Sequence, residues 1–141
     1  MPFEKLAIAE TKGVLTSLKT MDGKCQKFIV GSKEHTCKDF VVQSEYNNGG
    51  TGFWFSTNDE NSKLIVFSGW VQDQVVLESK KIKQPINRLI TFDSSELVEG
   101  LCTYGDLESG VSKIECKAVN YNGNIFRGIF ITDGKPPKNL N

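Results

Sequence analysis

Short apolar segments separated by clusters of glycine, asparagine and aspartate run through most of this 141-residue chain. The cluster Asn47-Asn48-Gly49-Gly50 divides residues 38–46 from 51–57, and a second polar cluster at 58–62 leads into 63–71. Residues of these types tolerate positive φ and form turns, and apolar runs of four to eight residues between turns are typical of strands. The pattern predicts an all-β protein with the strands 51–57 and 63–71 at the centre of an antiparallel meander.

Alternation within the strands indicates their faces. In residues 38–46 it places Phe40, Val42 and Tyr46 on one face and Asp39, Gln43 and Glu45 on the other. Near the C-terminus, Asn122-Gly123 is typical of a two-residue type I′ turn. That turn would set Tyr121 opposite Asn124. Counting outward, it gives the pairs Ala118–Arg127, Cys116–Ile129 and Ile114–Ile131, whose side chains we expect to face the core. Gly128 predicts a bend or a close approach by another segment.

The remaining segments carry weaker patterns. We expect a short strand at 75–77, a strand at 86–92, and a single helical turn at 94–100, which Ser94 caps and Gly100 ends. Residues 3–21 fit a helix or a strand, and their threonines favour the strand. Residues 133–141 are expected to form an extended, mobile tail.

One domain over 1–141 accounts for this length, since no repeat or linker divides the chain. About eight or nine strands with little helix predict a single-domain antiparallel β-sandwich or a small β-barrel, and the pattern leaves both open.

The four cysteines fall into two local pairs, Cys25 with Cys37 and Cys102 with Cys116. Because no CxxC occurs, a zinc ribbon or a thioredoxin-type site is not expected. The spacing suits two local disulfides, each worth about 3 kcal/mol in the chain-entropy model. Disulfides persist in oxidising compartments, which favours a periplasmic or secreted protein. The alternative is four buried thiols in a cytoplasmic protein.

No residue run has the apolar length of a signal-peptide core or of a membrane span, which needs about 18 residues. If the protein is exported, we expect Met1-Pro2 to mark where a leader was trimmed.

Charge and histidine content exclude several classes of function. The 17 basic residues balance the 17 acidic ones, which argues against a nucleic-acid partner. The lone histidine, His35, excludes metal sites that need two imidazoles and leaves little room for a histidine-based relay. We therefore expect no catalytic residue, metal or cofactor.

Paired carboxylates could hydrolyse sugars without histidine. Nearly all of the acidic candidates lie in predicted turns, where carboxylates usually act as solvated caps. They are Asp59, Glu60, Asp93, Glu96, Glu99, Asp106 and Glu108.

Aromatic residues raise one structural question. Phe53, Trp54 and Phe55 are consecutive, so in a strand they point to both faces. Either both faces are covered, or an exposed aromatic forms a binding surface. The candidate binding residues are Phe53, Trp54, Phe55 and Trp70.

The C-terminal part has a further pattern: PINRLI from Pro85, CTYGD from Cys102, IECKA from Ile114, and FRGIF from Phe126 leading to TDGKPP. With these motifs, the segment from Pro85 to Pro137 resembles small exported proteins of Gram-negative bacteria that have no assigned role. The resemblance implies export and the Cys102–Cys116 pairing, and it transfers no functional residue.

These observations favour a non-enzymatic binding role, with another protein as the partner, in the manner of an inhibitor or immunity protein; the oligomeric state stays open. The alternative is a small barrel that carries an apolar ligand in a cavity lined by Phe53, Phe55, Phe67 and Trp70. A carboxylate-dependent hydrolase comes third. A carrier should contain an apolar cavity, whereas a protein binder should have a filled core and an exposed apolar patch.

Overall fold

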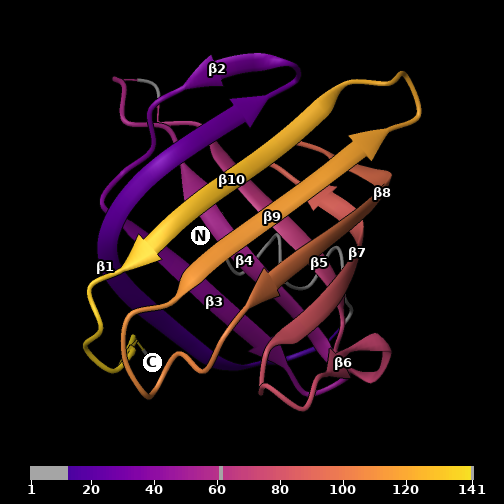
Figure 1. Ribbon diagram of the computed structural model, residues 1–141. Helices are drawn as coiled ribbons and strands as arrows, with labels where there is room; N and C mark the ends of the chain where they lie inside the picture. The colour runs from indigo at the N-terminus through magenta and orange to yellow at the C-terminus, as the bar shows by residue number, and fades with distance from the viewer. Residues whose placement is uncertain (1–12, 61, 141) are drawn as a thin grey trace.

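Eight antiparallel strands close into a barrel in the computed structural model, which describes residues 13–60 and 62–140 (Figure 1). Each wall strand pairs with the next in the chain, and the last pairs with the first. The wall consists of β1 (Leu15–Val30), β3 (Phe40–Tyr46), β4 (Gly50–Ser56), β5 (Leu64–Trp70), β7 (Ile82–Ile90), β8 (Ser95–Tyr104), β9 (Lys113–Asn120) and β10 (Ile125–Thr132). The all-β, single-domain prediction is confirmed, and of the two architectures it left open the barrel is the one present.

Three short strands and one helical turn accompany the wall. They are β2 (Lys33–His35), β6 (Val75–Val76), β11 (Lys138–Asn139) and the 3₁₀ helix η1 (Val71–Asp73). The C-terminal residues, predicted as an extended tail, run beside the first half of β1, where β11 pairs with Lys19 and Thr20. Strand β1 confirms the strand prediction from Leu15 onward, whereas residues 3–12 lie outside the described residues.

Aromatic rings fill the middle of the barrel. Phe28, Phe55 and Phe67 are fully buried, and the ring of Phe55 lies 5.6 Å from each of the other two, measured between centroids. Gly128 faces this cluster from β10: a Cβ there would lie 2.6 Å from Cε2 of Phe55. The predicted close approach at Gly128 is therefore confirmed, and its partner is an aromatic ring.

Trp54 points to the opposite face of β4. It is buried in a second apolar cluster on the outside of the wall, and its Nε1 donates a hydrogen bond of 2.9 Å to Oγ of Ser44. The other buried members of this outer cluster are Leu18, Val42, Val66 and Ile90. Both faces of the Phe53-Trp54-Phe55 run are thus covered.

Two disulfides cross-link neighbouring segments, and both are the local pairs predicted. Cys25–Cys37 joins β1 to the segment before β3, and Cys102–Cys116 joins residues that face each other on β8 and β9. Two such bonds indicate a non-reducing environment. Within the described residues, no helix has the length and apolarity to cross a bilayer.

The predicted register of the β9–β10 hairpin is wrong by one residue. Ile125 pairs with Val119 and Phe126 with Ala118, so that Phe126 and Phe130 face the core. The loop has three residues because the side-chain oxygen of Asn120 accepts the N–H groups of Asn122 and Asn124. A one-residue shift exchanges the two faces of a strand.

One other local prediction is wrong. Residues 94–100 do not form a helical turn: from Ser95 they belong to β8, which pairs with β7 on one side and β9 on the other. In β3 the two predicted faces are separated as expected. The face that carries Gln43 and Glu45 also carries the buried Val41, and it is the inner one.

Replacing Gly128 with alanine should destabilise the protein by about 1–3 kcal/mol, because the new methyl group overlaps the Phe55 ring. Urea unfolding of Gly128→Ala measures this. In a Phe55→Leu background, Gly128→Ala should lower the free energy of unfolding by less than it does in the wild type. Additive effects in this double-mutant cycle would show that the ring does not restrict Gly128.

Reduction of the purified protein should raise its intact mass by about four hydrogens, two for each disulfide. Mass spectrometry of the denatured protein, before and after reduction, measures this. An unchanged mass would mean that the four cysteines are free thiols.

Candidate functional site

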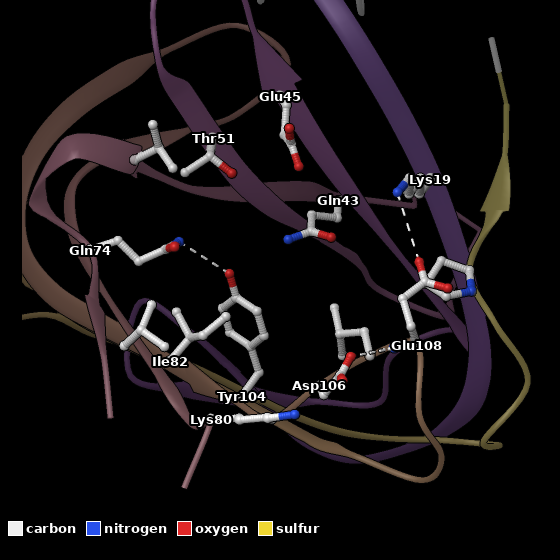
Figure 2. A pocket seen from close by; sticks show the side chains of 15 residues that line it. Lys19, Gln43, Glu45, Thr51, Gln74, Lys80, Ile82, Tyr104, Asp106 and Glu108 are labelled. Carbon is white, nitrogen blue, oxygen red and sulfur yellow. Dashed lines mark hydrogen bonds and ion pairs between the residues drawn. The ribbon is translucent and has the colours of Figure 1, made fainter. Parts of the chain in front are cut away.

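One end of the barrel holds a cavity of about 460 Å³, which we call the mouth (Figure 2). It lies where the end of β3, the segment 71–82, the loop 104–108 and Pro137 meet. This is the lower end in Figure 1, beside β6 and the C-terminus. The mouth therefore collects side chains from segments distant in the sequence.

Tyr104 separates the mouth from the aromatic core. Only 5% of its surface is exposed, and its ring meets Phe53 edge-on with centroids 4.9 Å apart. Its hydroxyl group points into the mouth, toward Gln74 (Figure 2). Ile82 and Leu107 add apolar wall. The side of the mouth next to the aromatic core is thus apolar, except for the hydroxyl group of Tyr104.

A chain of amide side chains leads to that hydroxyl. Gln84 is 2% exposed, and its Nε2 donates to the backbone oxygens of Trp70 (2.9 Å) and Pro85 (3.0 Å). Its Oε1 accepts from Nε2 of Gln74 at 2.8 Å, and the same Nε2 donates to Oη of Tyr104 at 3.3 Å. Every group of the Gln84 amide is therefore satisfied, as burial requires.

The strand pairing explains why an amide is needed there. The β5–β7 register runs from Val66–Ile90 to Ser68–Arg88 and extends no further. Pro85 has no N–H to continue the pairing. The side chain of Gln84 supplies a donor to the Trp70 carbonyl group in its place.

Burial raises the pKa of Tyr104 to about 12. Desolvation is the largest cause, and the negative charge of Glu45 adds to it; hydrogen bonds from Gln43 and Gln74 act in the opposite direction. Tyr104 is consequently a neutral phenol at physiological pH.

Charged side chains surround the mouth. Nζ of Lys19 lies 3.9 Å from a carboxylate oxygen of Glu108, and Oδ1 of Asp106 accepts the backbone N–H of Glu108. Glu45 extends into the mouth from the wall opposite Tyr104 (Figure 2). Lys80 completes the charged lining. The rim thus carries three carboxylates and two ammonium groups.

The segment between β5 and β7 forms one side of the mouth and carries exposed apolar residues. Val71 and Val76 line the cavity, and 48% and 63% of their surfaces are exposed. Val75, next to Val76 on β6, is also exposed but does not line the cavity. An apolar body entering the mouth would cover Val71 and Val76.

The opposite end of the barrel has a second hollow of about 560 Å³. Its walls include Leu64, Leu89 and the exposed Phe92. The polar side chains at its rim serve the turn that joins β7 to β8: Thr91 Oγ1 bonds to Asp93 and to Ser94. These hydrogen bonds hold the turn itself, whereas the polar chain at the mouth reaches into the interior.

The structure separates the four aromatic residues proposed as binding residues. Phe53 and Phe55 lie in the core and Trp54 in the outer cluster, whereas Trp70 is partly exposed at the end of β5. Phe67, proposed with them as a cavity wall, is fully buried against Phe55.

Four of the seven acidic candidates line a hollow at one of the two ends, whereas Asp59, Glu60 and Glu99 line neither of these hollows. Asp106 and Glu108 line the mouth, and Asp93 and Glu96 line the second hollow. His35 lies on β2, paired with Phe28. In the part of the chain that the structure describes, no group of three or more His, Cys, Asp or Glu side chains could hold a metal ion.

Sequence reasoning did not identify Tyr104, Gln74 or Gln84 as site residues. Gln84-Pro85 carries a usable signal, because proline cannot donate to the strand pairing and a neighbouring side-chain amide can supply a donor.

No family model matches the chain, and comparison with curated proteins and with solved structures finds no significant similarity. Function has to be argued from the site itself.

The raised pKa of Tyr104 predicts how stability depends on pH. The neutral phenol is favoured in the folded state, so its contribution is complete below the ordinary pKa of 10.0 and is lost as pH rises through about 12. Tyr104→Phe should flatten that part of the stability curve, measured by urea unfolding.

Glu45→Gln should lower the pKa of Tyr104, because it removes a negative charge near the phenol. Ultraviolet titration of the folded protein, with Tyr104→Phe used to assign the signal, measures the shift. An unchanged pKa would show that the Glu45 charge does not reach Tyr104.

Proposed function

We propose that the protein is a non-enzymatic binding protein that holds a small amphipathic molecule in the mouth of its barrel. The observation that carries this proposal is the convergence of a buried Tyr104–Gln74–Gln84 chain with apolar wall residues in one cavity. Small-molecule sites typically combine apolar walls with a few fixed polar groups. An eight-stranded barrel has room for one small ligand when side chains leave an end unfilled.

The same proposal places the protein in the periplasm or outside the cell. Two disulfides support an oxidising compartment, and the periplasm and the exterior are the usual ones. A binding protein there would meet small molecules before they enter the cell.

Binding of another protein, the role that the sequence favours, is the second candidate. The outer face of β8–β10 carries exposed apolar residues near the β9–β10 turn, where Val119 pairs with Ile125 and Tyr121 is 100% exposed. Arg127 lies on the same face, and tyrosine and arginine are enriched in protein interfaces. This face supports a protein partner of the inhibitor or immunity type.

Two neighbouring substitutions test binding at the mouth. Val76→Trp should block it by placing an indole ring in the cavity from an exposed position, whereas Val75→Trp adds the same ring outside the cavity. Titration of the labelled wild type with a set of amphipathic fragments, followed by NMR, should shift amide signals of mouth residues. Val76→Trp should abolish these shifts and Val75→Trp should retain them.

Shifts confined to the second hollow, or equal behaviour of the two tryptophan variants, would contradict the proposed site. If no fragment in the set shifts any mouth signal, the small-molecule proposal itself fails.

A further inference from the structure

Two polar side chains that line the mouth keep free hydrogen-bond acceptors. Nε2 of Gln74 uses both of its hydrogens, one on Gln84 and one on Tyr104, so the group that Gln74 keeps free is its carbonyl oxygen. Oγ1 of Thr51 donates its hydrogen to the backbone oxygen of Ser44 and keeps its lone pairs. A ligand in the mouth would therefore find a carbonyl and a hydroxyl oxygen ready to accept its N–H or O–H groups.

Glu45 adds a charged acceptor. Its carboxylate extends into the mouth (Figure 2). Among the described residues, this carboxylate forms no ion pair and no side-chain hydrogen bond. It shares the inner face of β3 with Gln43. A carboxylate accepts hydrogen bonds and donates none, so it favours a ligand that presents N–H or O–H groups.

The charge balance points the same way. The Lys19–Glu108 contact of 3.9 Å pairs one ammonium group with one carboxylate. Two carboxylates, Glu45 and Asp106, then face one remaining ammonium group, Lys80, around the same cavity. Net negative charge around a partly enclosed cavity attracts cations.

We infer that the ligand is an organic cation: a primary or secondary amine with a compact aliphatic or aryl body. The ammonium group donates to the Glu45 carboxylate and to the acceptors of Gln74 and Thr51, and the body contacts Val76 and Ile82. This inference rests on the proposed function and names the class of molecule that the mouth selects.

Three probes of equal chain length and different charge test the inference: hexylammonium, 1-hexanol and hexanoate. NMR titration of the labelled protein should give the tightest binding for hexylammonium, with shifts at the mouth, and that binding should weaken as sodium chloride is added. Hexanoate should bind weakest, because it brings a carboxylate beside Glu45 and Asp106.

Glu45→Gln should weaken hexylammonium binding by about tenfold or more, because an ionised hydrogen-bond partner is lost, and should leave 1-hexanol unaffected. The matched control is Glu34→Gln: Glu34 lies on β2 at the other end of the barrel, where its carboxylate is 3.8 Å from Nζ of Lys27. The control should bind hexylammonium like the wild type.

Equal binding of the three probes, tighter binding of 1-hexanol or hexanoate, or full binding by Glu45→Gln overturns the amine class and leaves the proposed function standing. Absence of hexylammonium shifts at the mouth also overturns it, whereas only failure of the whole fragment set overturns the proposed function.

Discussion

The antiparallel pairing of β1 with β10 turns a meander of eight strands into a closed wall, and the interior of the molecule depends on it. β1 changes partner along its length: Leu15–Asp22 pairs with β3, and Gly23–Ile29 pairs with β10. At the change, a Cβ on Gly23 would meet the backbone oxygen of Ile131, so only glycine permits the two strands to approach. Closure leaves the wall without an open edge that could pair with other chains.

A closed wall assigns each strand residue to the inside or the outside. An eight-stranded barrel has an interior just wide enough for side chains to fill, and Phe28, Phe55 and Phe67 fill the middle of this one. Space for a ligand is therefore left at the ends. At the inner positions nearest the mouth, among them Gln43 and Tyr104, a polar group can reach the cavity instead of being enclosed by the aromatic core.

Sequence alone predicts those parts of the fold that local patterns determine. The strands around 51–57 and 63–71 follow from apolar runs between turn residues, and both disulfide pairs follow from spacing. The register of the last hairpin does not, because a side chain of the strand, Asn120, lengthens the turn that Asn122-Gly123 suggests. β8 was missed because polar residues and Gly100 interrupt its start, while its pairing on both sides is set by partners elsewhere in the chain.

The candidate site is harder to predict because its polarity originates in the backbone. Where β5 and β7 cease to pair, the carbonyl groups of Trp70 and Pro85 take both hydrogens of the Gln84 amide. That leaves the Gln84 oxygen to orient the donor end of Gln74, which in turn reaches Tyr104. With both hydrogens of the Gln74 amide used, its carbonyl oxygen is the group that it leaves for the cavity. An apolar residue in place of Gln84 would leave the carbonyl groups of Trp70 and Pro85 without this donor, which costs free energy. The amide therefore completes the strand pairing and also sets the direction in which the mouth is polar.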